Sequence, residues 1–172
     1  MVRGRVPGPV GGFLAVSRLR RLLADDRVAT VARIAIGALF IYASVTKFDP
    51  AKFAQQVANY RLLPTGLVNL VAIALPFIEF FAGALLVLGL RIRGASLVIV
   101  GCLCAFIGAM AWAWAKGIDI ECGCFGKGTK VGLRAVSEDV GMLALALETY
   151  VFDRGRFALD RVVAALLRPG AA

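Results

Sequence analysis

The chain has 172 residues, of which 60% are hydrophobic and only 18% are charged, and its mean hydropathy is +0.81. A water-soluble domain of this length cannot bury so much apolar surface, so the composition excludes a disordered chain, a collagen and an ordinary cytosolic enzyme. The net charge of +9 does not indicate a nucleic-acid partner, because the basic residues lie between apolar runs rather than on one polar face.

The chain begins with a basic, glycine-containing segment over residues 1–27, which we interpret as a cytoplasmic tail. Four apolar runs follow, and each has close to the ~20 residues that a helix needs to cross the hydrocarbon core; they cover residues 28–46, 67–90, 94–115 and 135–152. The sequence therefore predicts an all-α integral membrane four-helix bundle as one domain over residues 28–152, with the fourth run the weakest. Small residues such as Gly83, Gly101 and Gly108 are expected to let the helices approach closely.

The last segment, residues 153–172, contains apolar residues at helical spacing between charged ones. It is too short to span a membrane, and it predicts an amphipathic cytoplasmic helix that lies on the membrane surface or packs on a partner.

The Lys and Arg residues predict an orientation for a multi-pass protein of the cell membrane. Twelve of them lie in the two tails and the second loop, and seven lie in the first and third loops. The positive-inside rule then places both termini in the cytoplasm and the third loop, with Cys122 and Cys124, outside it.

Glu79 interrupts the second apolar run near its middle, three residues after Pro76. An acid at that depth is costly and normally faces the bundle interior or a cavity. Arg33, in the first run, is the partner that we predict from the depth of the two residues along straight helices. An ion pair that fixes the bundle is one interpretation of Glu79, and an acid of a proton or quinone site is the other.

The third loop contains the sequence Cys122-Gly123-Cys124. A disulfide between cysteines so close in sequence is strained and therefore easily reduced, which is typical of thiol–disulfide exchange. Lysines nearby would favour the thiolate form. A structural disulfide is an alternative; so is a metal ligand pair, although we predict no metal site because the chain has no histidine.

Cys102 and Cys104 lie within the third run. Two positions apart on a helix, they face different neighbours and cannot pair with each other. We expect them to act as small apolar residues, with an electron relay as the alternative.

Several of these features together resemble a known family. The residues that carry the resemblance lie after the first run and before and within the second; they are Lys47, Phe48, Pro50, Tyr60, Leu63, Pro64, Pro76, Glu79 and Gly83. At these positions the chain resembles the DoxX-like membrane proteins. The segment Cys122-Gly123-Cys124-Phe125-Gly126 narrows the resemblance to the branch of MauE, the methylamine utilisation proteins. The resemblance covers roughly residues 28–150.

This resemblance implies a membrane protein that supports maturation of an extracytoplasmic amine dehydrogenase together with a thioredoxin-like partner, with Cys122 and Cys124 as the redox pair. The chain departs from four-helix quinone-linked thiol oxidases because it has no Cys-x-x-Cys, which argues against autonomous oxidase activity. A membrane oxidoreductase is the alternative partner. For the function, the alternatives are a non-enzymatic membrane scaffold and a small subunit of a quinone-linked oxidoreductase. The second of these would make a quinone the candidate cofactor.

Overall fold

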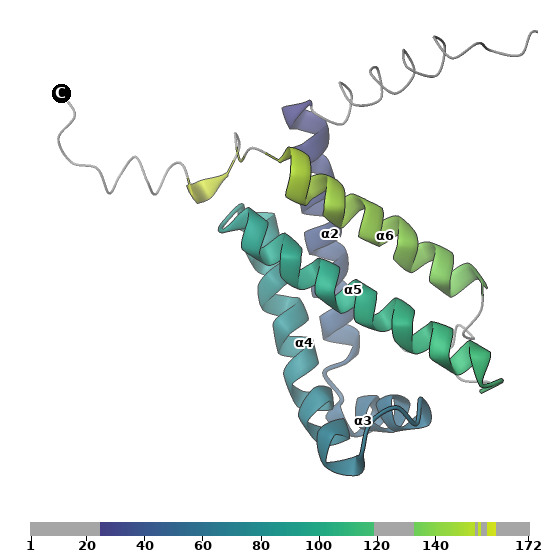
Figure 1. Cartoon of the computed structure of the whole chain (residues 1–172). Helices are drawn as coiled ribbons and strands as arrows, with labels where there is room; N and C mark the ends of the chain where they lie inside the picture. The colour runs from purple at the N-terminus through teal and green to yellow at the C-terminus, as the bar shows by residue number, and fades with distance from the viewer. Residues whose placement is uncertain (1–24, 119–132, 154, 156–157, 161–172) are drawn as a thin grey trace, which may run out of the picture.

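The computed structural model describes residues 25–118, 133–153, 155 and 158–160 (Figure 1). This part of the chain is helical and contains no strand; its helices are α2 (Asp26–Thr46), α3 (Pro50–Asn59), α4 (Thr65–Leu88), α5 (Ile92–Ala115) and α6 (Leu133–Phe152). The predicted all-α fold is confirmed. The cysteine pair of the third loop and most of the predicted C-terminal amphipathic helix lie outside the described residues.

Three of these helices, α2, α4 and α5, are long and apolar enough to cross a membrane. Their outward surfaces carry large apolar side chains: Val31 is 67% exposed, Leu70 60% and Phe81 61%. Such surfaces suit hydrocarbon rather than water, so the chain is a membrane protein. The helix α6 forms where the fourth span was predicted, but it is not among the three helices that are apolar enough to cross a membrane. It carries four charged residues, Arg134, Glu138, Asp139 and Glu148.

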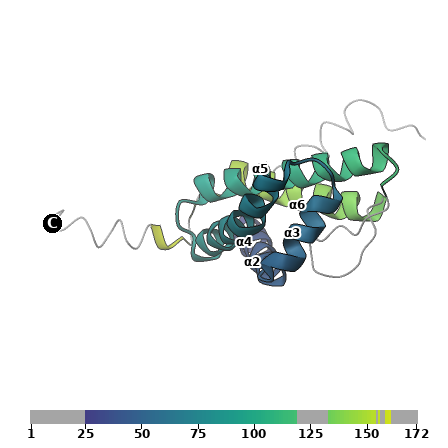
Figure 2. The same ribbon diagram turned by 90° about the horizontal axis from the view of Figure 1, so that it is seen from below.

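The long helices associate as two pairs. The helix α2 packs mainly on α4, and α5 packs mainly on α6, while α6 also contacts α2 (Figures 1 and 2). Between the pairs lies an apolar core whose most deeply buried members are Ile36, Leu86, Ile99, Leu103 and Ala146. The bundle interior is therefore formed by side chains from α2, α4, α5 and α6 together.

Gly37 and Gly83 set the close crossing of α2 and α4. A Cβ atom added to Gly83 would lie 2.6 Å from the carbonyl oxygen of Gly37, and one added to Gly37 would lie 2.8 Å from that of Gly83. Backbone atoms cannot move away as a flexible side chain can, so only glycine fits at both positions. Gly101 and Gly108 do not have this role, because a Cβ at either would meet nothing within 4 Å.

The helix α3 was not predicted. Asp49 caps its N-terminus by accepting a hydrogen bond from the backbone N–H of Lys52, and Pro50 occupies the first turn, where its missing N–H is not needed. The buried side chain of Phe53 faces inward, and α3 packs along α4 beyond the point where α2 ends. This short helix forms one wall of the cavity described below.

Candidate functional site

A buried ion pair joins the end of α2 to the middle of α4. Lys47, the residue that caps α2, donates hydrogen bonds from Nζ to both carboxylate oxygens of Glu79, each at 2.8 Å. The residues are only 4% and 1% exposed. The lysine side chain extends back along the helix toward its N-terminus, as helical side chains do. A pair so completely removed from solvent requires this close geometry to offset the cost of desolvation.

Asp139 brings a second carboxyl group to the same place from α6. It is 2% exposed, and it lines a small internal cavity together with Lys47 and Glu79. Its Oδ2 has no hydrogen-bond partner among the described residues. We refer to Lys47, Glu79 and Asp139 as the charge cluster. Two carboxyl groups and one ammonium converge there in an otherwise apolar interior, which is an arrangement typical of functional intramembrane sites.

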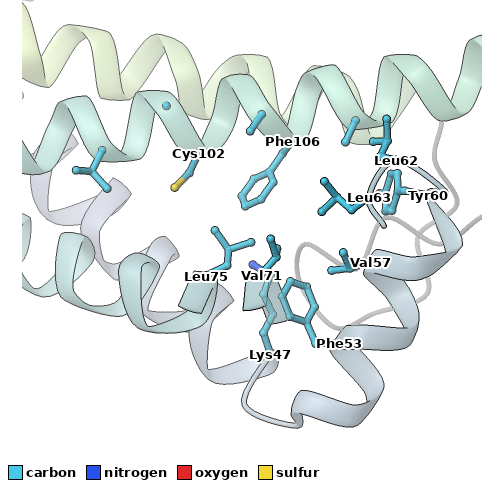
Figure 3. A pocket seen from close by; sticks show the side chains of 14 residues that line it. Lys47, Phe53, Val57, Tyr60, Leu62, Leu63, Val71, Leu75, Cys102 and Phe106 are labelled. Atoms are coloured by element: carbon cyan, nitrogen blue, oxygen red, sulfur yellow. The ribbon is translucent and has the colours of Figure 1, made fainter. Parts of the chain in front are cut away.

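Next to the charge cluster is a cavity of about 650 Å³ between α3, α4 and α5, which we call the side cavity. Figure 3 shows Cys102 and Phe106 of α5 on one side, facing Val71 and Leu75 of α4 and the side chain of Lys47 on the other. The remaining wall is apolar or aromatic; it includes Phe53, Val57, Tyr60, Leu62 and Leu63. The volume lies within the range of small-molecule sites, about 300–1,000 Å³.

The side cavity exists because α5 presents small residues to it. Gly101, Ala105 and Ala109 line it from that helix, and a Cβ on Gly101 would meet nothing within 4 Å. The prediction that Gly101 lets two helices approach closely was therefore wrong: its missing side chain leaves open space instead.

The two cysteines of α5 face different surroundings, as predicted. Cys102 is half-buried and lines the side cavity, whereas Cys104 is exposed on the outside of the helix. Both are free thiols. Cys102 is thus the nearer of the two to the charge cluster.

Cys122 and Cys124, the predicted redox pair, lie outside the described residues. The chain leaves the described region at the C-terminal end of α5 and returns at Leu133, the first residue of α6, and these two helix ends lie near each other in Figure 1. We call the connecting segment, residues 119–132, the cysteine loop. Asp139 of the charge cluster follows Leu133 by about two helical turns.

The predicted pairing of Glu79 with Arg33 was wrong. Arg33 instead donates a hydrogen bond from Nη1 to the carbonyl oxygen of Leu86 at 2.7 Å, and its Nε lies 2.9 Å from Oδ2 of Asp153. Those groups are near the C-terminal ends of α4 and α6, whereas Glu79 lies two turns earlier in α4. Arg33 therefore ties together the end of the bundle opposite to the charge cluster.

Two members of the charge cluster, Lys47 and Asp139, were not predicted to form a site with Glu79. Lys47 was counted as a loop cation because it follows the apolar run directly. One signal could have identified it: a lysine at the end of a span has a long side chain that can bury its stem along apolar surface and place the charge elsewhere. Asp139 gave no comparable signal, because its neighbour Glu138 is also acidic and only the helix packing shows which of the two faces inward.

The described residues contain no cluster of three or more His, Cys, Asp or Glu side chains that could hold a metal ion. The charge cluster has only two carboxyl groups, and one of them is already paired with the ammonium group of Lys47. The side chains of Lys47, Glu79 and Asp139 can form hydrogen bonds and exchange protons next to an apolar cavity.

Comparison with known proteins assigns the chain to a family. The model of the methylamine utilisation protein MauE matches residues 25–151. The methylamine utilization protein MauE of Paracoccus denitrificans is 31% identical over 129 residues, which are 73% of this chain and 69% of that protein. No solved structure gives a significant match. The long stretch shared with both shows that this chain belongs to the MauE family of methylamine utilisation proteins.

Proposed function

We propose that this MauE-family protein carries out thiol–disulfide exchange through Cys122 and Cys124 and so supports maturation of an extracytoplasmic enzyme of amine metabolism. The observation that carries the proposal is the Cys122-Gly123-Cys124 sequence in a membrane protein of this family. The glycine allows the tight backbone that such a small disulfide ring needs, and the resulting strain makes the bond easy to reduce.

The proposed orientation places both termini in the cytoplasm and the cysteine loop outside it. The distribution of Lys and Arg supports this topology, since the tails and the second loop carry most of them. An extracytoplasmic loop lies in a compartment where disulfides persist. With both termini on the same side, α6 must cross the membrane in addition to the three candidate spans. The burial of Asp139 and Glu148 against the other helices supports this, because these two charges are turned away from the lipid.

The exchange itself needs no additional reagent. A thiolate of a thioredoxin-like partner attacks one sulfur of the Cys122–Cys124 disulfide and forms a mixed disulfide, which the second thiol of the partner resolves. The partner loses two electrons and two protons in becoming a disulfide, and the loop gains both in becoming a dithiol. The reverse reaction passes the electrons to the partner.

The first test is differential alkylation in intact cells with a membrane-impermeant thiol reagent. A chain in which Cys102 and Cys104 are replaced by serine leaves only the loop thiols to label. We expect labelling of Cys122 and Cys124 only after mild reduction. Labelling that fails both with and without reduction would contradict the extracytoplasmic position, and labelling without reduction would contradict a resting disulfide.

The second test is functional. We expect Cys122→Ser and Cys124→Ser each to abolish formation of the disulfides in the matured enzyme while the protein still accumulates in the membrane. Cys104→Ser is the matched control, because Cys104 is exposed on the outside of α5. Normal disulfide formation in both loop variants would reject thiol exchange and favour a scaffold that holds the enzyme at the membrane.

A further inference from the structure

We propose that the side cavity binds a neutral, lipid-soluble ring compound whose carbonyl oxygen accepts a hydrogen bond from Lys47; a membrane quinone has this chemistry. The proposal does not depend on thiol exchange in the cysteine loop. It rests on the composition of the cavity wall, on the donor that Lys47 offers, and on the charge balance behind it.

The cavity wall selects an apolar ligand with a planar part. Apart from Lys47, the hydroxyl group of Tyr60 and the thiol of Cys102, the residues that line it are hydrocarbon in character. Three of them, Phe53, Tyr60 and Phe106, contribute aromatic rings, which pack well against the face or edge of another ring. A water-soluble metabolite would lose its hydration there with little compensation.

Lys47 supplies the polar contact that fixes the ligand. Its ammonium group has three N–H bonds, and hydrogen bonds to Glu79 use two of them. The centroids of the Phe53 and Phe106 rings, both in the cavity wall, lie 5.9 Å and 5.3 Å from Nζ, so the ammonium group is at the edge of the side cavity. The third N–H has no acceptor among the described residues and is available to a ligand in the side cavity.

The charge balance favours a neutral acceptor over an anionic one. Glu79 already neutralises Lys47, and Asp139 shares the small cavity behind them. A carboxylate or phosphate head group would therefore meet no uncompensated positive charge and would approach two acidic residues. A carbonyl oxygen brings a partial charge only and needs just one donor.

The test uses the full chain purified in detergent and immobilised, with tritiated decylubiquinone as the probe. Two competitors separate the sources of affinity: decylbenzene has a ring and a chain but no carbonyl, and dodecanoate has a chain and an anionic head. We expect saturable binding of the probe, competition by decylbenzene at least tenfold weaker than by unlabelled decylubiquinone, and no competition by dodecanoate. A charged hydrogen bond accounts for a factor of about ten or more.

Two independent changes to the protein complete the test. Lys47→Met with Glu79→Gln removes the donor without leaving a lone buried charge, and we expect it to weaken binding at least tenfold. Gly101→Leu fills the cavity from α5 and leaves the ion pair untouched, so it should abolish binding. Gly108→Leu is its matched control: a Cβ there also meets open space, but Gly108 does not line the side cavity.

Protection of Cys102 gives a second measurement. In a chain with Cys104, Cys122 and Cys124 replaced by serine, decylubiquinone should slow the alkylation of Cys102 by N-ethylmaleimide, because that thiol lines the cavity. Absence of saturable binding, unchanged binding in the Lys47→Met, Glu79→Gln variant, or competition by dodecanoate equal to that of unlabelled decylubiquinone would each overturn the proposal. The last result would identify a site for the chain of an anionic lipid instead.

Discussion

Lys47 and Glu79, 32 residues apart in the sequence, form a fully buried ion pair in which Nζ lies 2.8 Å from each carboxylate oxygen. The pair closes the end of α2 onto the middle of α4 and forms part of the boundary between the side cavity and the bundle interior. It is thus both a structural contact and the polar edge of the proposed ligand site.

Removing one member of this pair should be more damaging than removing both. Lys47→Met or Glu79→Gln alone changes one partner of a buried pair, and breaking such a pair costs roughly 3–5 kcal/mol in the free energy of unfolding. The combined variant leaves no unpaired charge, so we expect it to recover much of the loss. Thermal unfolding of the purified chain in detergent measures this as a double-mutant cycle; additive effects of the two substitutions would contradict the coupling.

Gly83→Ala should force α2 and α4 apart, because the new methyl group would lie 2.6 Å from a backbone oxygen of α2. Overpacking of this kind costs about 1–3 kcal/mol. Gly94→Ala is the control: it makes the same change in α5 where a Cβ meets nothing within 4 Å, and alanine favours a helix over glycine. The midpoint of thermal unfolding should fall for the first variant and hold or rise for the second. Equal midpoints would show that the crossing tolerates a side chain.

Arg33→Lys should destabilise the other end of the bundle although it keeps the charge. The guanidinium reaches the carbonyl oxygen of Leu86 and the carboxylate of Asp153 through different nitrogens, and a single amine cannot reproduce that fork. We expect a loss of about 1–3 kcal/mol, the cost of leaving a buried polar group unsatisfied. Arg93→Lys, at an exposed position, should have no comparable effect on urea or thermal unfolding; a matching effect there would point to a general consequence of the substitution.

The cap of α3 should weaken in acid. The hydrogen bond from the Lys52 side chain to Asp49, together with that from the Lys52 backbone N–H, lowers the pKa of the Asp49 carboxyl below its usual value. A lowered pKa in the folded state means that the carboxylate stabilises the fold above the pKa of the unfolded chain and that this contribution disappears as the pH falls through the lowered value. Protection of the α3 amides from hydrogen exchange should therefore decrease in acid. At each pH, this protection is compared with the protection of amides in a helix of the same protein that has no side-chain cap.

Asp49→Asn provides the control for this experiment, because asparagine caps a helix about as well as aspartate but does not titrate in this range. In this variant, the protection of the α3 amides relative to the same reference helix without a side-chain cap should not change with pH. The same acid dependence in both proteins would assign the effect to another group.

The long helices could be predicted from the sequence because a continuous apolar run of about 20 residues has few other interpretations. The predicted runs and the observed helices differ by two residues or fewer at their ends, for example residues 67–90 against Thr65–Leu88. The helix α3 could not be predicted in this way. It has ten residues, and in a short segment of mixed polarity its existence depends on packing against α4 as much as on its own sequence.

The site was harder to predict than the fold. Glu79 was identified correctly as a buried acid, but its partner was chosen by comparing depths along straight helices, which treats each residue as a point on an axis. Side-chain reach decides the outcome instead: Lys47 lies beyond the last turn of α2 and reaches back to Glu79, while Arg33 reaches toward the end of α4. The rotation of α6 that buries Asp139 depends on how that helix packs, which a single apolar run does not encode.

In the part of the chain that the structure describes, each buried ion pair joins a cation of α2 or of its C-terminal cap to an acid that comes later in the sequence. Lys47 pairs with Glu79, and Arg33 pairs with Asp153. Synthesis proceeds from the N-terminus, so α2 is completed while it carries two cations without their counter-charges. The first is neutralised when α4 has been made, and the second only when the chain has passed the end of α6. A chain halted before Asp153 would therefore hold Arg33 without the carboxylate of its ion pair, while the carbonyl oxygen of Leu86 would already be present to accept its hydrogen bond.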